Sequence, residues 1–145
     1  MNLEKLDIAF LRGSGEMATN TQQQILKDII KTNIAPAMKK AGFKRKGNWF
    51  VRRGRVYDKY LNVMSSRWNT AEEASFTLDI YVMNKDGVPT KDIEVANKRI
   101  GHLKTGRDYW YTLTPKANAE KLGQEIENDI SEYALPFFDK YEGGK

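Results

Sequence analysis

The stretch FTLDIYVM, residues 76–83, alternates strongly apolar side chains with others and is the clearest structural signal in this chain. Phe, Leu, Ile and Val take every second position, and side chains at every second position of a β-strand share one face. Thr, Asp, Tyr and Met form the opposite face. The stretch therefore predicts a half-buried strand that packs one face on a core.

Two further strand-like segments precede this stretch. Residues 49–52 and 56–64 flank Arg53-Gly54-Arg55, and this arrangement predicts a β-hairpin. Residues 65–74 form a polar loop, and residues 109–113 form a short strand after it in the chain. The connections are short, which favours antiparallel pairing. We therefore expect an antiparallel sheet of about four strands.

Helical periodicity appears before the strands. Thr21-Gln22-Gln23-Gln24 has the pattern of a capping box, and Gly42 is a typical stop. Pro36 lies inside the periodic segment and predicts a kink or a restart near Asn33, because proline lacks an N–H group. The apolar positions that step by four are Leu26, Ile30, Ile34 and Met38.

A second helix is expected after the strands. Thr114-Pro115 is a typical helix start, with Thr as N-cap and Pro in the first turn, and Leu135-Pro136 predicts its end. Acidic residues occupy the face opposite the apolar one. The predicted fold class is α+β, with the sheet flanked by an N-terminal and a C-terminal helix packed on one face. The apolar face of the second helix consists of Leu122, Ile126, Ile130 and Tyr133.

The composition of the 145 residues excludes several chemistries. There is no Cys, so disulfides, thiolate nucleophiles and Cys-type zinc sites are excluded, and the single His102 cannot build a multi-His metal centre. No apolar run approaches the length of a membrane span, and the N-terminus does not resemble a secretory signal. We expect a cytoplasmic protein that binds no metal, cofactor or membrane, and the sequence does not predict its oligomeric state.

The charge is distributed unevenly. The net charge is +5, yet segment 39–55 contains eight basic residues and no acidic one, which leaves 16 basic against 19 acidic residues elsewhere. The chain is therefore electrically polar rather than uniformly basic. The basic residues of the segment are Lys39, Lys40, Lys44, Arg45, Lys46, Arg52, Arg53 and Arg55.

Residues 1–16 differ in composition from the rest. Gly13-Ser14-Gly15 has linker composition, and Met17 could start a natural chain. One hypothesis is a fused peptide plus linker at 1–16 and a single α+β domain at 17–145; the alternative is a native N-terminal element with a Gly-Ser-Gly turn. A fused peptide would contact the domain through Leu3, Leu6, Phe10 and Leu11.

An ordered set of short stretches, over residues 20–140, resembles a bacterial family catalogued as domain of unknown function 4304. No activity is established for that family, so the resemblance implies the fold and the domain limits and nothing about chemistry. The stretches are GFKRKGNWF at 42–50, SSRWN at 65–69, FTLDI at 76–80, RIGHL at 99–103, DYWY at 108–111 and LPFF at 135–138.

The basic segment is the strongest indication of function. Basic side chains on a hairpin, with a Trp between them, can contact an acidic protein, and the Arg67-Trp68 loop offers a second contact. We therefore expect a non-enzymatic module that binds a protein or peptide partner, and an acidic partner would complement the charge of the segment. The expected contact residues are Arg45, Lys46, Trp49, Arg52, Arg53, Arg67 and Trp68.

Three alternatives remain open. Segment 39–55 could bind nucleic acid by gripping phosphates and stacking a base, although its partial match to the RNA-recognition signature, at Lys46-Gly47 and Phe50-Val51, falls on the wrong strand of the order and is treated as coincidence. The charges could instead only protect an edge strand from aggregation. A metal-dependent hydrolase would have to use Asp58, Asp79 or His102, which lack the expected motif context.

Overall fold

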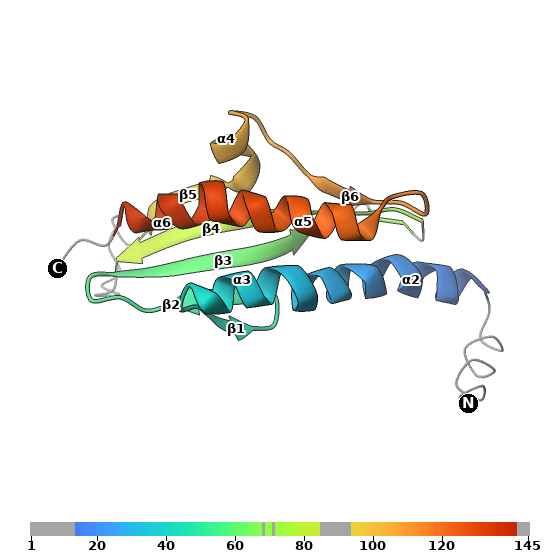
Figure 1. Cartoon of the computed structure of the whole chain (residues 1–145), viewed down its shortest axis with the longest axis horizontal. Coiled ribbons are helices and arrows are strands. Elements are labelled where there is room, and N and C mark those ends of the chain that lie inside the picture. Colours follow the sequence, from blue (N-terminus) through green and yellow to red (C-terminus); the bar gives the residue numbers. More distant parts are fainter. Residues whose placement is uncertain (1–13, 68, 71, 85–93, 142–145) are drawn as a thin grey trace.

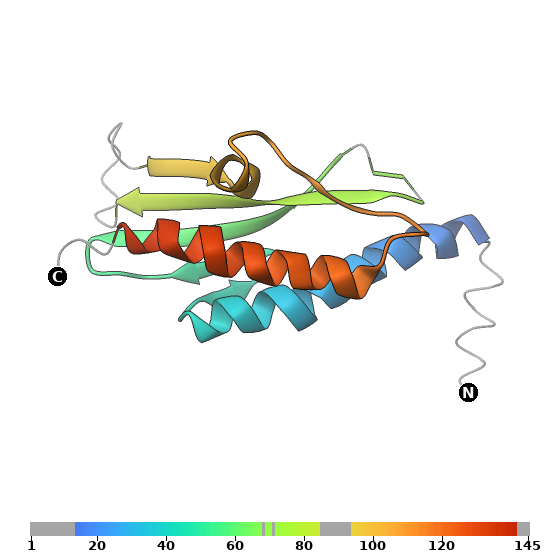
Figure 2. The same ribbon diagram turned by 45° about the horizontal axis from the view of Figure 1, so that its top comes forward.

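A computed structural model describes residues 14–67, 69–70, 72–84 and 94–141 of the chain. These residues form two layers, a β-sheet and a layer of helices that covers one of its faces (Figures 1 and 2). The predicted α+β class and the packing of both terminal helices on one face are confirmed.

The sheet is antiparallel and contains six strands among the described residues. It exceeds the expected four or so because Lys44–Lys46 and Glu94–Arg99 also pair. The order is β1-β2-β3-β4-β5, with β6 also pairing with β4. The strands are β1 (Lys44–Lys46), β2 (Trp49–Arg52), β3 (Tyr57–Ser65), β4 (Ala74–Asn84), β5 (Glu94–Arg99) and β6 (Tyr111–Leu113).

One edge of β4 is shared by two short strands. β5 pairs with residues 79–83 and β6 with residues 74–76, and both run antiparallel to β4. β6 therefore continues the line of β5, and residues 100–110 leave the sheet between them. This excursion begins with the short helix α4 (Ile100–Lys104), which packs on the helical side of the sheet.

Strand β4 is more deeply buried than its alternation predicts. Its helix-facing side chains from Phe76 to Val82 are fully buried, as expected. Thr77 and Asp79 on the opposite face are also buried, so the half-buried prediction is wrong for this part of the strand. Both have hydrogen-bond partners, which makes their burial tolerable: the Thr77 hydroxyl donates to the carbonyl of Tyr109, and Asp79 accepts from Tyr81 and Asn97.

The first helical segment contains α2 (Ser14–Ile29), a π-helical turn η1 (Ile30–Ile34) and α3 (Ala35–Lys40). The amide of Ala35 donates to the carbonyl of Ile30, five residues back. This wider turn places Pro36 in the first turn of α3, where its missing N–H group costs little. The predicted kink or restart near Asn33 takes the form of this widened turn, through which the helix continues, and Gly42 follows the segment with φ of 93°.

The last helical segment also has a π-helical turn just before a proline. It contains α5 (Ala119–Asp129), a π-helical turn η2 (Ile130–Ala134) and α6 (Leu135–Asp139). Pro136 lies in the first turn of α6, so the prediction that Leu135-Pro136 ends the helix is wrong. The amide of Leu135 donates to the carbonyl of Ile130, and the widened turn lets the helix axis continue past the proline.

The two helical segments lie side by side and run in the same direction across the sheet (Figure 1). The Asn33 side chain in η1 donates a hydrogen bond to Glu127 in α5. Their inner faces and the helix side of the sheet enclose one hydrophobic core. Among the described residues, no helix has the length and apolar character needed to cross a membrane.

Both predicted helix starts are wrong. Helix α2 begins at Ser14, so Thr21-Gln22-Gln23-Gln24 lies within it rather than capping it. Helix α5 begins at Ala119, because Thr114 and Pro115 form a turn in which the amide of Ala117 donates to the carbonyl of Thr114. Asn118 caps α5 instead, and its Oδ1 accepts from the amide of Lys121 at 3.0 Å.

Replacing Asn118 with alanine is expected to lower the free energy of unfolding by about 1 kcal/mol, because the amide of Lys121 then loses its partner. Urea denaturation followed by circular dichroism measures this change. Gln124→Ala, at an exposed site on the same helix, is the control and should change stability by less than about 0.5 kcal/mol. Equal effects of the two substitutions would show that Asn118 is not the cap.

Candidate functional site

The basic segment folds into a hairpin at one edge of the sheet. β1 and β2 pair across a turn at Gly47-Asn48, and Gly47 has φ of 62°, a conformation that favours glycine. The guanidinium of Arg45 donates to the carbonyl of Gly47 at 2.8 Å. β1 consists of three exposed basic residues and forms the edge of the sheet among the described strands.

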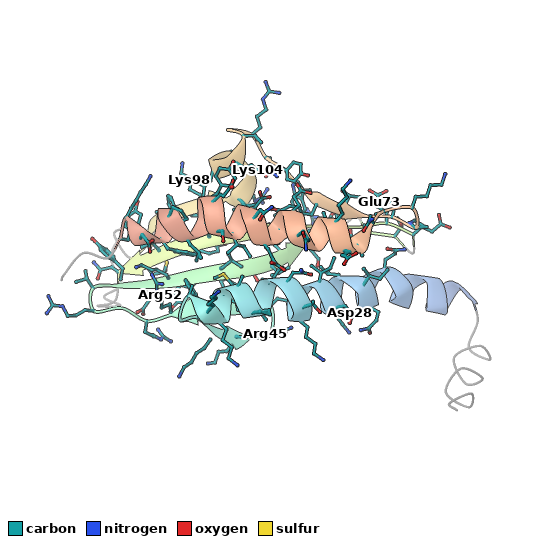
Figure 3. The ribbon with its side chains drawn as sticks, viewed as in Figure 1. Asp28, Arg45, Arg52, Glu73, Lys98 and Lys104 are labelled. Atoms are coloured by element: carbon teal, nitrogen blue, oxygen red, sulfur yellow. The ribbon has the colours of Figure 1, made fainter. Side chains whose placement is uncertain are left out.

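The alternation of β1 distributes its charges between two surfaces. Arg45 pairs with the buried Phe50 and lies in a row on the helix side of the sheet (Figure 3). Lys44 and Lys46 lie on the opposite side, which we call the open face. Its two central rows are Lys46, Trp49, Asn62, Asp79 and Arg99, and Lys44, Val51, Tyr60, Tyr81 and Asn97.

On the helix side, a groove of about 520 Å³ runs between α3 and the β1 edge. Phe43 and Phe50 form the base of its apolar floor, where both are almost fully buried, and Ala35 and Gly42 also line it. Lys39 and Arg45 are exposed and lie at its rim. The groove thus combines an apolar floor with a basic border beside a sheet edge. Its lining residues are Ala35, Lys39, Gly42, Phe43, Lys44, Arg45 and Phe50.

Two of the predicted contact residues are engaged within the fold. Arg52 donates to the carbonyl of Ala41 at 2.8 Å and stands over the ring of Phe43, so it holds the end of α3 against the sheet. Arg53 forms an ion pair with Asp58 at 2.8 Å. This hydrogen bond raises the pKa of the Arg53 guanidinium above its usual value.

Trp49 lies at the centre of an aromatic group on the open face. Its side chain is 40% exposed, which is unusual for Trp. The ring contacts Tyr81 at 5.7 Å between centroids and Tyr60 edge-on at 6.2 Å. The three rings come from β2, β3 and β4, so register brings together residues that are 11 or more positions apart in the chain.

Trp110 adds an aromatic ring at the far edge of the open face. Arg99 stands over this ring at 5.4 Å and pairs with Asp108 at 2.9 Å. Tyr109 and Tyr111 point to the helix side instead, where their hydroxyl groups bond to residues of α5. Trp110 and its two neighbouring tyrosines therefore lie on opposite faces of the sheet.

The structure brings the hairpin turn and the Arg67 loop together. Asn48 lines a hollow of about 420 Å³ together with Ser65, Ser66, Arg67 and Asn69. The Asn69 side chain accepts from the amide of Ser75, which fixes the base of the loop. The neighbouring Trp68, the other expected contact of this loop, lies outside the described residues, and so do Leu3, Leu6, Phe10 and Leu11.

A family model described as Domain of unknown function (DUF4304) matches residues 34–140, which is most of the chain. The chain belongs to the DUF4304 family. The match includes all six strands, the hairpin and the segment from α5 to α6, but begins at the end of η1 rather than at residue 20. No curated protein and no solved structure matches the chain.

A polar cluster in this DUF4304 domain joins the excursion after β5 to α5, and sequence reasoning missed it. Lys104 donates to Glu125 and Asp129, both at 2.9 Å, and points from α4 towards α5 (Figure 3). The Tyr111 hydroxyl donates to Asp129 at 2.7 Å, and Tyr109 donates to Glu125 at 2.9 Å. Asp129 is buried, so the expectation that the acids of α5 face solvent is wrong for it.

Burial and hydrogen bonding shift the pKa values of this cluster. Burial alone would lower the pKa of Lys104, but its two carboxylate partners outweigh burial and raise the pKa above its usual value. Burial raises the pKa of Tyr111, and the hydrogen bond to Asp129 adds to that effect. The sequence signals were the alternation of the two tyrosines and the four-residue spacing of Glu125 and Asp129, which place each pair on one face.

The residues considered for hydrolysis do not converge. Asp58 accepts from Arg53 and from the amide of Gly54, while Asp79 bonds to other partners four residues further along the sheet, about 13 Å away. His102 is exposed on α4. Within the described ranges, no three His, Cys, Asp or Glu side chains are grouped so that they could hold a metal ion.

Proposed function

We propose that this DUF4304 domain is a non-enzymatic binding module that takes an acidic, partly apolar peptide segment of a partner protein at the groove between α3 and β1. The observation that carries the proposal is the combination of an apolar floor, at Phe43 and Phe50, with a basic rim, at Lys39 and Arg45. A peptide with both apolar and acidic side chains complements that combination.

The edge of β1 supports an extended binding mode. Among the described strands β1 pairs only with β2, so its outer N–H and C=O groups can pair with an added strand. Side chains of an added strand would alternate between the groove and the open face. Acidic residues would then lie opposite the three basic residues of β1, and opposite charges across a strand pair are stabilising.

Protection against aggregation explains only part of this surface. Three basic residues on an edge strand discourage pairing between sheets. That role requires charge alone and does not call for an apolar hollow beside the strand. The loop that contains Arg67 extends the proposed contact surface at the hairpin turn, because both line one hollow. A chain without Cys is compatible with action in the cytoplasm, which we include in the proposal.

Reversing the charges of the rim tests the proposal. A labelled ten-residue peptide that alternates Glu with Val is expected to bind the wild-type protein, and Lys39→Glu combined with Arg45→Glu is expected to weaken binding at least about tenfold. Fluorescence anisotropy measures both. Lys98→Glu is the matched control and should not change binding. Lys98 is exposed and lies in the same row and on the same face as Arg45, but on β5, far from the groove.

A peptide that alternates Lys with Val serves as the control ligand. Equal binding of the acidic and basic peptides, or equal loss in the Lys98→Glu protein, would contradict the proposal. Absence of binding by the acidic peptide would contradict it as well.

A further inference from the structure

The open face of the sheet is a second surface with features of its own. None of the described helices covers it, since both helical segments and α4 lie on the other side (Figures 1 and 2). It faces away from the groove and presents other side chains of the basic hairpin: strand alternation places Lys44 and Lys46 on it and Arg45 on the helix side, although Lys44 also borders the groove. A ligand on this face therefore depends on Trp49 and Lys46, which do not line the groove.

The aromatic group on this face is held in place before any ligand arrives. Trp49 is flanked by Tyr60 and Tyr81, with which it makes edge and tilted ring contacts. Tyr81 is itself fixed by the hydrogen bond from its hydroxyl to Asp79 at 2.8 Å. Since these rings are already ordered, a ligand that stacks on Trp49 loses little additional conformational entropy.

The charges of the open face leave two cations unmatched. Asp58 pairs with Arg53, and Asp108 with Arg99. Asp79 is 6% exposed and uses both carboxylate oxygens for internal hydrogen bonds. The side chains of Lys44 and Lys46 make no ion pair or hydrogen bond with a described residue, so this edge of the face is positive.

We propose that a single-stranded nucleic acid binds across the open face, with one base stacked on Trp49 and phosphates held by Lys44 and Lys46. An exposed aromatic ring beside cations is the combination that such ligands use, because every base has a π-face and every nucleotide has a negative phosphate. An acidic peptide would use the cations but gains nothing from stacking. A duplex hides the faces of its bases, so it would gain only the charge contacts.

The dimensions of the face suit a short segment. From β1 to β5 there are four interstrand spacings, or about 19 Å, and sheets that bind RNA in this way stack about two or three bases. Arg99 and Trp110 lie at the far side of this path and form a second stacking and charge contact. Asn62 lies between Trp49 and Asp79 in one row, and its side-chain amide has no hydrogen bond to a described residue, so it can bond to a base edge.

The test uses labelled ten-nucleotide oligo-dT and oligo-U, with a mixed-sequence duplex of equal length as comparison. Fluorescence anisotropy is expected to show that a single strand binds. The slope of log K against log salt concentration should be about −2, because Lys44, Lys46 and Arg99 each contact a phosphate. Trp49→Ala is expected to weaken that binding about tenfold or more, and Trp49→Phe by less, because Phe retains a stacking ring. Lys44→Gln combined with Lys46→Gln should reduce the slope by about 1.4.

Matched controls separate this surface from the groove. Arg45→Gln removes one charge from the same strand but from the helix side, so binding of a single strand should change little. Circular dichroism of each variant confirms that it is folded. Equal affinity for the duplex or unchanged affinity in Trp49→Ala would overturn the proposal. Neither result would decide whether a peptide binds at the groove, which is tested separately through Lys39 and Arg45.

Discussion

Replacing Gly101 with alanine is expected to lower the free energy of unfolding by about 3 kcal/mol. A Cβ atom at position 101 would stand 2.6 Å from the carbonyl oxygen of Arg107 and 2.7 Å from the Cβ of Tyr109, and it would also collide with the amide nitrogen of Tyr109. Two of these three atoms belong to the backbone. No change of rotamer relieves such a clash, so the whole loop after α4 would have to move.

Thermal and urea denaturation measure this effect, and for a chain of this size the Tm should fall by roughly 10 °C. His102→Ala is the matched control, because His102 is the next residue on the same helix and is exposed. It should change stability by less than about 0.5 kcal/mol. A loss below 1 kcal/mol in Gly101→Ala would show that residues 105–109 do not pack on α4 as described.

Gly101 also links the fold to the open face. The loop that packs on it leads directly to Asp108 and Trp110, which surround Arg99 at the far edge of that face. If the loop moves in Gly101→Ala, this edge changes while Trp49 and the hairpin stay in place. The variant should therefore be less stable. Its affinity for a single strand should fall only by the part that Arg99 and Trp110 contribute.

Local signals were sufficient for the centre of the sheet. The alternation over residues 76–83 and the glycine between residues 52 and 56 predict β4 and the hairpin of β2 and β3, and both are confirmed. These signals work because period and turn chemistry are properties of a few neighbouring residues. The edge strand β1 was missed because three consecutive basic residues have no alternation to detect.

The local sequence pattern does not determine where the helices begin and end. Pro136 normally ends a helix, but η2 widens the turn before it and lets the buried face continue to Phe138. Thr114-Pro115 is a typical start, yet it forms a turn and leaves the cap to Asn118. In both places more than one local solution exists, and packing against the sheet selects one.

Composition identifies the candidate site, but the pairing of the strands decides which face of the sheet each of its residues lies on. A segment with eight basic residues and no acidic one can be recognised from the sequence alone. That Arg45 faces the groove while Lys46 faces the opposite side follows only from the pairing of β1 with β2. Arg52 was expected to contact a partner and instead supports the end of α3. The tyrosines beside Trp49 come from other strands, so no local pattern could have joined them.

Replacing Asp129 with alanine is expected to cost about 3 kcal/mol of stability. The substitution leaves the buried Tyr111 hydroxyl without its acceptor and takes one of two carboxylate partners from Lys104. Breaking a buried ion pair from one side costs about 3 to 5 kcal/mol, and the lower end applies because Lys104 keeps Glu125. Urea denaturation measures the loss, and Glu132→Ala, at an exposed acid of the following turn, is the control.

A double-mutant cycle separates the two partners of Asp129. Tyr111→Phe alone should cost about 1 to 2 kcal/mol, because Asp129 keeps its ion pair with Lys104. Adding Tyr111→Phe to Asp129→Ala should cost clearly less than the sum of the two single losses. Strict additivity would show that the hydroxyl and the carboxylate do not interact in the folded protein.

The pH dependence gives an independent test of the same cluster. Lys104, Tyr109 and Tyr111 each have a raised pKa in the folded protein, so above about pH 10 the unfolded chain releases protons that the folded chain retains. The stability they contribute is fully present below that pH and is lost as the pH rises, by up to about 1.4 kcal/mol per pH unit for each group. In Asp129→Ala the pKa values of Lys104 and Tyr111 lose one raising partner, so the alkaline decline should be shallower than in the wild type. An equally steep decline in both proteins would show that Asp129 does not raise the pKa values of Lys104 and Tyr111.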